Sequence, residues 1–542
     1  MCGIVGTNFS SKEFDSSVEL LKHRGPDNQT SISYKNNQFG HTRLSIIDLD
    51  NEANQPMEFD DIIITFNGEI YNFQELIKNE NLHCITKSDT EVLIRLYQKY
   101  DTDFLNKLNG MFSFCIYDKK KDKFFCARDR FGKKPFYYYF KDGKFIYASE
   151  IKSILLLIEN KVNINKEAIY EYLEYGSSIA PNTIYENIYK LKHSCFLTVS
   201  ENELEIDYYY DYANFKTAVY DEKTAVKKIE DTLIKSLEYR LVSDVEIGSF
   251  LSGGLDSSLL SSMYSNITNQ KINTFSIGYN EHKNYCELNY AEKASKHVKS
   301  NHHQFTIDKN DFLSTIDSFI NIMDEPFADS ASIPTYLLSK FTHQHNIKVA
   351  LSGEGSDEIF LGYDLYHNLL KSKNEYSGFN KGFESNLNKN FKSSYNYPNQ
   401  FSYIDLNIWV PEILMNKVDK MAMASSLEVR SPFLDHNLVS LLFSIDDKIK
   451  VGNTNKYLLK KVAKKYLPDE IIHRRKKGFS SPYIEWIEQE YNINLKDYII
   501  KNLIKSDIFS FKEIEYFKNY DFNNKQKTWT LFILAKWLEN RG

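Results

Sequence analysis

The pattern of apolar residues changes once along the chain, near residues 205–220. Before this point, short β-rich runs such as Met111–Tyr117 alternate with turn signals, and Asp89–Tyr100 has the spacing of a helix. Such a mixture, rich in antiparallel signals, is typical of an α+β domain. The chain of 542 residues has room for two to four domains at about 150 residues each. We therefore expect a first domain over residues 2–205, followed by a linker at 206–220.

Two dipeptides that contain glycine mark expected turns in this first part. The run Ile62–Phe66 is followed by Asn67-Gly68, and Asp142-Gly143 separates two further β-rich runs. Both dipeptides are strong hairpin signals, because these residues tolerate the positive φ angles of tight turns. We expect the strand that begins at Ile62 to end at Asn67, and a hairpin at Asp142.

The rest of the chain shows strands separated by helices. A helical spacing covers residues 221–241, Val245–Leu251 predicts a buried strand, and Ser257–Tyr264 predicts the helix after it. Another strand is expected at Lys348–Leu351. This order is the signature of a parallel α/β sheet. Residues 221–542 are therefore expected to form an α/β domain with a helical C-terminal part.

Charge and cysteine content argue against several classes of protein. There are 67 Lys and Arg against 73 Asp and Glu, a net charge of −6, which gives no support to a nucleic-acid binder. None of the 6 cysteines forms a CxxC pair, so neither a zinc ribbon nor a redox pair is encoded. No apolar run approaches the length of about 18 residues that a membrane span needs. The first residues lack a secretory signal, so we expect no membrane partner and a cytoplasmic location.

Cys2 differs from the other cysteines because of its position. If Met1 is removed, Cys2 carries both a thiol and a free α-amine. The thiolate is the nucleophile, and the amine, with a pKa of about 7.7–8.0, can accept the thiol proton near neutral pH. One residue then supplies both nucleophile and base. Alone, a cysteine at this position is weak evidence for such a role.

Four sequence blocks accompany Cys2 in the first part. They are His23-Arg24-Gly25-Pro26-Asp27, Arg43-Leu44-Ser45-Ile46-Ile47-Asp48, Asn67-Gly68-Glu69-Ile70-Tyr71-Asn72 and Ser88-Asp89-Thr90-Glu91. Together with Cys2 they resemble the glutaminase domain of the class II glutamine amidotransferases. The resemblance implies the αββα sandwich of the N-terminal-nucleophile hydrolases.

The chemistry of these blocks fits hydrolysis of an amide. The Asn67 side-chain amide and a backbone N–H at Gly68 suit an oxyanion hole, in which one donor is worth about 3–4 kcal/mol to a tetrahedral intermediate. The resemblance further implies that Arg43 pairs with the α-carboxylate of glutamine, while Glu69 and Asp89 hold its α-ammonium group.

The turn after the predicted strand Val245–Leu251 reads Ser252-Gly253-Gly254-Leu255-Asp256-Ser257. Serine hydroxyls and glycine amides at the start of a helix form a cradle for anions. The chain contains neither a Walker A motif nor GxGxxG. The loop looks like that of the ATP pyrophosphatases, which cleave between the α- and β-phosphates. A simple turn between strand and helix is the structural alternative.

A second polar cluster follows the strand Lys348–Leu351. It reads Ser352-Gly353-Glu354-Gly355-Ser356-Asp357-Glu358 and lies at the carboxyl end of a predicted parallel strand, where such sheets bind ligands. Mg²⁺ takes one or two carboxylates together with phosphate oxygens. Asp256 and Asp357 are therefore candidate ligands of a Mg²⁺ ion that accompanies ATP.

Three later motifs extend the resemblance. These are Asp419-Lys420-Met421, the run Glu428-Val429-Arg430-Ser431-Pro432-Phe433-Leu434-Asp435, and Arg474-Arg475-Lys476-Lys477-Gly478-Phe479. With them, nearly the whole chain resembles the glutamine-hydrolysing asparagine synthetases. The resemblance implies a nucleotide site that includes Leu251, Ser252, Gly253, Gly254, Ser257, Ile277, Ser352 and Gly353. It also implies an acyl-adenylate centre at Glu354 and Lys476, with the stretch Asp324–Ser330 bordering the acceptor pocket.

The implied reaction has two steps. Cys2 releases ammonia from glutamine, and the second domain activates a carboxylate with ATP and Mg²⁺ for amidation. Aspartate is the expected acceptor; another carboxylate, such as a uronic acid of a surface polysaccharide, is the alternative. A phosphoribosyl-binding transferase with the same glutaminase domain is disfavoured by the loop at Ser252–Ser257, and an inactive relative by the presence of every named chemical residue. The sequence is silent on oligomeric state, which leaves a homodimer open.

Overall fold

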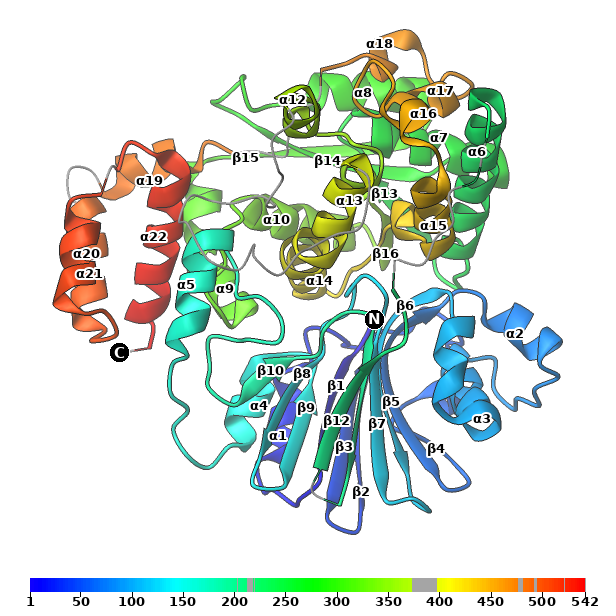
Figure 1. Cartoon of the computed structure of the whole chain (residues 1–542), viewed down its shortest axis with the longest axis vertical. Helices are drawn as coiled ribbons and strands as arrows, with labels where there is room; N and C mark the ends of the chain where they lie inside the picture. The colour runs from blue at the N-terminus through cyan, green and yellow to red at the C-terminus, as the bar shows by residue number, and fades with distance from the viewer. Residues whose placement is uncertain are drawn as a thin grey trace.

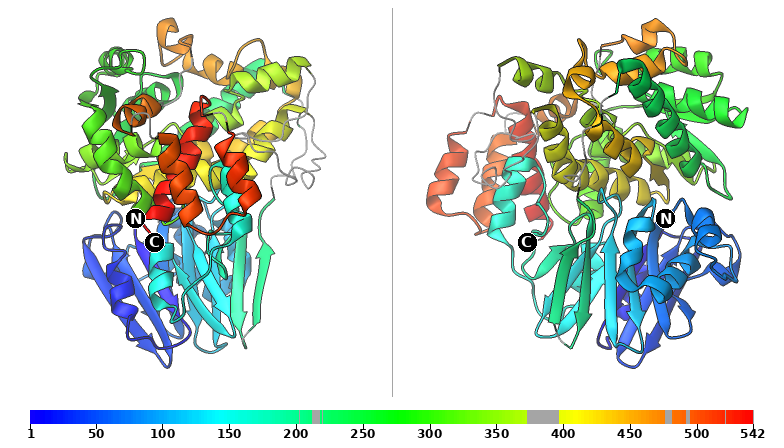
Figure 2. Two further views of the ribbon diagram at one scale, coloured as in Figure 1. Left: turned by 90° about the vertical axis from the view of Figure 1, so that its left-hand side faces the viewer. Right: turned by 45° about the vertical axis from the view of Figure 1, so that its right-hand side comes forward.

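The computed structural model describes residues 1–201, 203–211, 218, 220–372, 397–475, 481–491, 495–520 and 522–541. In Figure 1 the antiparallel sheets of the first part lie below, and a parallel sheet with its helices lies above. The two further views in Figure 2 show the same division.

The described residues of the first part form two six-stranded antiparallel sheets. Their strand orders are β10-β8-β9-β1-β3-β2 and β12-β11-β7-β6-β5-β4. The bounds are β1 Gly3–Thr7, β2 Asn28–Tyr34, β3 Asn37–Arg43, β4 Met57–Phe59, β5 Ile62–Ile70, β6 Gly110–Asp118, β7 Lys123–Arg128, β8 Tyr137–Lys141, β9 Lys144–Ala148, β10 Ile188–Lys190, β11 Cys195–Ser200 and β12 Glu203–Tyr208.

Apolar side chains from both sheets pack between them. Ile4 and Phe39 of the first sheet join Ile63, Phe124 and Leu197 of the second in one buried cluster. The helices α1 (Phe14–Glu19) and α4 (Ile151–Leu157) contact strands of the first sheet, and α3 (Asp89–Tyr100) contacts the second. The predicted αββα sandwich is confirmed.

The turn predicted at Asn67-Gly68 is wrong. β5 continues through both residues to Ile70, and β6 pairs with it along its whole length, with Gly68 opposite Phe112. Local turn propensity is overridden here by nine consecutive cross-strand partners. The hairpin at Asp142-Gly143, between β8 and β9, is confirmed.

A five-stranded parallel sheet organises the second part. Its order is β15-β14-β13-β16-β17, and it is built from β13 Ile247–Phe250, β14 Asn273–Tyr279, β15 Asn301–Ile307, β16 Val349–Leu351 and β17 Glu428–Arg430. The helix α6 (Glu222–Arg240) precedes β13 and buries Ile229, Leu233 and Leu237, as its spacing predicts. The helix α7 (Leu255–Thr268) follows β13. The α/β class with a helical C-terminal part is confirmed, and β17 is an element that the sequence did not reveal.

C-terminal helices return to the first part of the chain. In Figures 1 and 2, α20 (Leu495–Lys505), α21 (Phe511–Lys518) and α22 (Lys525–Glu539) stand beside α5 (Lys166–Tyr175). The Tyr172 hydroxyl donates to the Thr530 carbonyl oxygen at 2.7 Å. No helix among the described residues is long and apolar enough to cross a membrane.

Buried ion pairs join the two parts where they meet. The Arg24 guanidinium lies 2.8 Å from the Asp419 carboxylate and 3.1 Å from Glu150, and Lys134 lies 3.1 Å from Asp419. Each of these four side chains is at most 2% exposed. The amino terminus lies at the same junction (Figure 1).

Candidate active site

Cys2 is buried directly before β1, at the junction of the two parts. Its backbone N–H donates to Asn67 Oδ1 at 3.1 Å, and Arg24 Nε donates to its carbonyl oxygen at 3.1 Å. Burial raises the pKa of the thiol, while Arg43 and the chain's amino terminus act in the opposite sense. The ammonium group of Met1 lies 3.4 Å from Glu428 of the second part. Removal of Met1 would turn the Cys2 nitrogen into an amine held next to Asn67.

Asn67 and Gly68 are fixed in the middle of a strand. Asn67 is fully buried, and its Nδ2 has no hydrogen-bond partner among the described residues. A Cβ atom on Gly68 would lie 2.1 Å from the Met111 carbonyl oxygen, so only glycine fits there. An unpaired buried donor is costly, and a ligand that accepts from it recovers that cost. This arrangement suits a group that binds an oxyanion.

Two buried carboxylates lie near Cys2. Burial and the neighbouring Glu428 and Asp89 raise the pKa of Glu69 well above its ordinary value. Burial raises the pKa of Asp89 to about 7, although its Oδ2 accepts from the Ile70 N–H at 2.8 Å. Two carboxylates that are hard to ionise together form a site that favours an added cation.

Arg43 ends β3 and directs its guanidinium into a loop. Nη1 donates to Asn54 Oδ1 and to the Asp50 carbonyl oxygen, each at 2.8 Å, and Nη2 donates to the Asp48 carbonyl oxygen. The charge of Arg43 also acts to lower the pKa of the Cys2 thiol, against the burial that raises it. The structure therefore gathers the predicted glutamine-binding residues around Cys2.

A cavity of about 640 Å³ lies at the carboxyl ends of β13, β14 and β16. Most of the residues predicted for the nucleotide, Mg²⁺ and acyl-adenylate sites line it, namely Leu251, Ser252, Gly254, Asp256, Ser257, Ile277, Ser352, Gly353, Glu354 and Asp357. Gly253 belongs to the same loop but is not among the lining residues. A Cβ atom on Gly353 would lie 3.0 Å from the Asp256 Cβ atom, so the loops after β13 and β16 are in contact.

The loop between β13 and α7 has the geometry of an anion cradle. Gly253 has a φ of +70°, and a Cβ atom there would lie 2.3 Å from the Tyr290 carbonyl carbon. The Ser252 N–H donates to Ser257 Oγ at 3.2 Å, which closes the loop at the start of α7. A helix N-terminus preceded by small residues leaves backbone N–H groups for phosphate oxygens.

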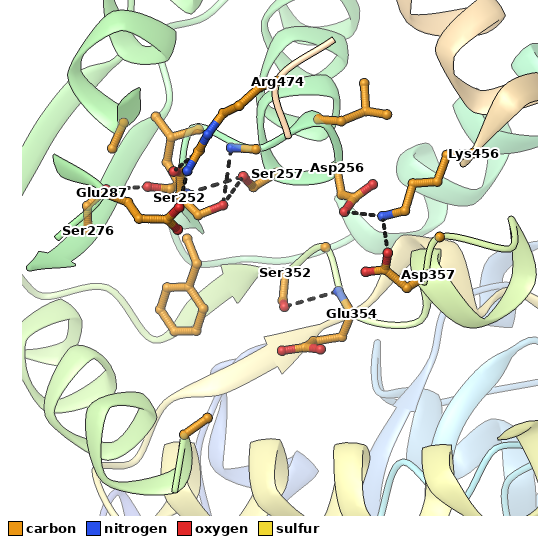
Figure 3. Close-up of a pocket in the computed structure, with 18 of the residues that line it drawn as sticks. Ser252, Asp256, Ser257, Ser276, Glu287, Ser352, Glu354, Asp357, Lys456 and Arg474 are labelled. Atoms are coloured by element: carbon orange, nitrogen blue, oxygen red, sulfur yellow. Dashed lines mark hydrogen bonds and ion pairs between the residues drawn. The ribbon is translucent and has the colours of Figure 1, made fainter. Parts of the chain in front are cut away.

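Asp256 and Asp357 converge on one cation, as Figure 3 shows. Lys456 Nζ lies 2.6 Å from Asp256 Oδ2 and 2.8 Å from Asp357 Oδ1, and both carboxylates raise the pKa of this lysine. Two carboxylates at one cation position beside a phosphate cradle fit Mg²⁺ in ligand type. Sequence reasoning missed Lys456, because this lysine lies outside every recognised motif and nothing in its local sequence distinguishes it from an exposed lysine.

The segment that leads to the predicted residue Lys476 is described only as far as Arg475. Lys476 lies outside the described residues. Its neighbour Arg474 forms an ion pair with Glu287 and donates to the Ser252 carbonyl oxygen at 3.1 Å, so the segment before Lys476 reaches the cavity (Figure 3).

A further oppositely charged pair, Lys417 with Asp329, lies in the cavity, and sequence reasoning missed this lysine as well. Lys417 Nζ lies 3.1 Å from Asp329 Oδ2, and Lys417 is only 8% exposed. Both residues line the cavity together with Glu354, whose charge also raises the pKa of Lys417. Asp329 falls in the stretch that was expected to border the acceptor pocket, but its lysine partner comes from a distant helix.

Comparison with known proteins adds an independent line of evidence. A family model described as asparagine synthase matches residues 228–539, and one described as a glutamine amidotransferase domain matches residues 1–210. Asparagine synthetase [glutamine-hydrolyzing] 1 of Bacillus subtilis is 30% identical, over 99% of this chain and 96% of its own length. A putative asparagine synthetase 2 of Methanocaldococcus jannaschii is 38% identical, over 68% of this chain and 76% of its own. Amidase chry2 of Gibberella zeae is 24% identical, over 88% of this chain and 86% of its own.

Proposed function

The chain belongs to the family of glutamine-hydrolysing asparagine synthetases, and from that premise we propose that it forms asparagine from aspartate, with glutamine as nitrogen donor and ATP as activating substrate. The observation that carries this proposal is the presence of both sites in one chain. In the first part, Cys2 lies beside the buried amide of Asn67, whose Nδ2 has no hydrogen-bond partner in the part of the chain that the structure describes. In the second part, two strand-end loops converge at a cavity. The proposed glutaminase and synthetase domains are residues 2–205 and 221–542.

In the first half-reaction the Cys2 sulfur attacks the side-chain amide carbon of glutamine. The α-amine of Cys2, freed by removal of Met1, takes the thiol proton and passes it to the leaving nitrogen, so that ammonia departs and a thioester remains. Water then releases glutamate. Asn67 Nδ2 and the Gly68 N–H would hold the oxyanion of each tetrahedral intermediate. The buried Nδ2 supports this role, because no described residue accepts a hydrogen bond from it.

Recognition of glutamine uses both charges of its backbone end. Arg43 would pair with the α-carboxylate, and Glu69 with Asp89 would hold the α-ammonium group. The raised pKa values of these two carboxylates support the assignment, because burial disfavours their charged forms and a bound cation would offset that cost.

In the second half-reaction the acceptor carboxylate attacks the α-phosphorus of ATP, and pyrophosphate leaves. Ammonia then attacks the acyl-adenylate carbonyl, AMP leaves, and Glu354 accepts a proton from the attacking nitrogen. The loop at Ser252–Ser257 would bind the pyrophosphate portion, and Lys476 would stabilise charge at the reacting centre. Mg²⁺ held by Asp256 and Asp357 would neutralise charge on the phosphate oxygens when bound.

The choice of aspartate as acceptor draws support from the pair Lys417 and Asp329. Opposite charges 3.1 Å apart in the wall of the cavity complement a zwitterion, which brings both a carboxylate and an ammonium group. A uronic acid offers hydroxyl groups where an amino acid offers its ammonium group. The observation therefore favours an amino-acid acceptor.

The test is product analysis with the purified chain. With aspartate, glutamine, ATP and Mg²⁺, we expect asparagine, glutamate, AMP and pyrophosphate. Formation of AMP with glucuronate but not with aspartate would reject aspartate as the acceptor, while the proposed activation of a carboxylate by ATP would stand. Absence of AMP with every carboxylate would reject the function itself. The homodimer stays a prediction, which light scattering on the purified protein would test.

A further inference from the structure

One residue of the second part contacts both sites. Arg430 ends β17, and its side chain is fully buried. In the parallel pairing of β16 with β17, Leu351 lies opposite Arg430, and the Ser352 N–H donates to the Arg430 carbonyl oxygen at 2.9 Å. Ser352 lines the nucleotide cavity. The main chain of Arg430 is therefore attached to the loop that follows β16.

The side chain of Arg430 extends in the other direction, to the proposed glutamine site. Its Nη2 lies 3.8 Å from Glu69 Oε1. The guanidinium lowers the pKa of both Glu69 and Asp89, against the burial that raises them. The two carboxylates belong to the first part of the chain, and this cation comes from the second.

The guanidinium is held rigidly relative to its own strand. Arg430 Nε lies 2.5 Å from Glu428 Oε1, and Nη1 donates to the carbonyl oxygens of Arg240 and Val242 at 2.8 and 2.7 Å. A side chain with these contacts moves with β17 and the segments packed on it. A movement of the Ser352 loop that displaces β17 would therefore change the position of the charge that faces Glu69.

We propose that Arg430 is a positioning residue of the glutamine site. Its guanidinium faces Glu69 Oε1 at 3.8 Å and orients that carboxylate toward the α-ammonium of glutamine, and its main chain links the carboxylate to the nucleotide loop at Ser352. This inference rests on the proposed role of Glu69. If a nucleotide in the cavity shifts this contact, it changes the affinity for glutamine, and because linkage between two ligands is reciprocal, glutamine then changes the affinity for the nucleotide by the same factor.

The test uses the full chain with Arg430→Met and Arg430→Lys. We expect Arg430→Met to raise the KM for glutamine by about tenfold with a smaller change in kcat, and Arg430→Lys to restore most of the loss. The acid limb of kcat/KM should move to higher pH in Arg430→Met. Asp89, Glu428, Tyr71 and the amino terminus also face Glu69 and are unchanged in both variants. Equal KM values in the wild type and Arg430→Met would overturn the proposal.

A double-variant cycle separates positioning from general damage to the fold. Since Arg430 contacts Glu69 directly and acts on Asp89 only through its charge, adding Arg430→Met to Glu69→Gln should raise the KM for glutamine much less than it does in the wild type. If the increases in KM that the two single variants cause multiply in the double variant, the proposal is overturned. Ammonia-dependent synthesis, which does not use Glu69, should persist in each variant; its loss from a folded Arg430→Met protein would also overturn it.

The linkage has its own readout. Saturating ATP with acceptor should change the KM for glutamine of the wild type by about fivefold or more, and should leave that of Arg430→Met unchanged. The same shift in both proteins would overturn the link to Ser352. A wild type that hydrolyses no glutamine would instead reject the proposed function, before any variant is compared.

Discussion

Asn67 shows how a single residue can carry an unpaired group for chemistry. Its Oδ1 accepts from the Cys2 N–H, while its buried Nδ2 has no partner among the described residues. Leaving a buried donor unpaired costs stability unless a ligand uses it. The oxygen thus positions the nucleophile, and the nitrogen is left for the substrate.

Replacement of Asn67 by Ala tests the oxyanion hole. We expect kcat for glutamine hydrolysis to fall by about 10²–10³-fold, because one donor to the intermediate is lost. Steady-state glutamate release measures this. Asn72→Ala is a matched control, since Asn72 lies farther along the same segment and donates to the Lys107 carbonyl oxygen. A similar loss in both variants would argue against the assignment.

The pKa of Asp89 predicts a pH dependence of glutamine binding. Burial raises this pKa to about 7, so the carboxylate is neutral below that pH and charged above it. Since an ammonium group binds the charged form, kcat/KM for glutamine should fall as pH drops through about 7. Bound ammonium favours the charged carboxylate, so kcat should fall only at lower pH. If kcat/KM of an Asp89→Asn variant falls at low pH in the same way as that of the wild type, the fall does not come from protonation of Asp89.

At this scale the sequence predicts residues that lie in motifs and misses partners from distant segments. Cys2, Asn67 and Asp89 stand in recognisable blocks, and the structure places them together. Lys456 and Lys417 become visible only when the fold brings them to Asp256 and Asp329. No local pattern distinguishes such lysines from exposed ones.

At the scale of elements, the loop between β13 and α7 depends on one backbone conformation. Gly253 combines a positive φ with close contact to the Tyr290 carbonyl group, whereas Gly254 has a φ of −81°. The strands and helices around the loop were predictable from their apolar spacing. The continuation of β5 through Asn67-Gly68 was not, because the pairing that enforces it lies more than forty residues away in β6.

Gly253→Ala should disable the second site alone. The added methyl group meets backbone atoms at 2.3 Å and a strained φ, so the loop must shift. We expect AMP formation to be lost while glutaminase activity remains. In the control Gly254→Ala, the nearest atom is Ser252 Oγ at 3.2 Å, and most activity should remain. Equal losses in the two variants would show that the conformation of Gly253 is not the cause.

At the scale of the whole molecule, the two parts meet through buried charges. Arg24 contacts the Cys2 carbonyl oxygen in the first part and Asp419 in the second. Breaking such a buried pair by removing one partner costs about 3–5 kcal/mol, because the other charge stays buried. The order of the two parts was predictable from the sequence. Their contact surface was not, since it depends on pairs separated by hundreds of residues.

Cys2→Ala tests whether the sites act separately within this joined molecule. We expect synthesis from glutamine to be abolished and synthesis from ammonium salts to be retained, because ammonia can reach the acyl-adenylate without the thiol. Asparagine measured with each nitrogen source, in the same preparation, gives the answer. Loss of both activities from a folded variant would mean that the second site requires Cys2.

The ammonium group of Lys456 between Asp256 and Asp357 has a practical meaning for handling the protein. Two acidic groups that already share a built-in counter-ion do not need a divalent ion to stay close. A preparation stripped with a chelator should keep its melting temperature, whereas a Lys456→Met preparation should become sensitive to the chelator. Magnesium would then matter for turnover and not for storage.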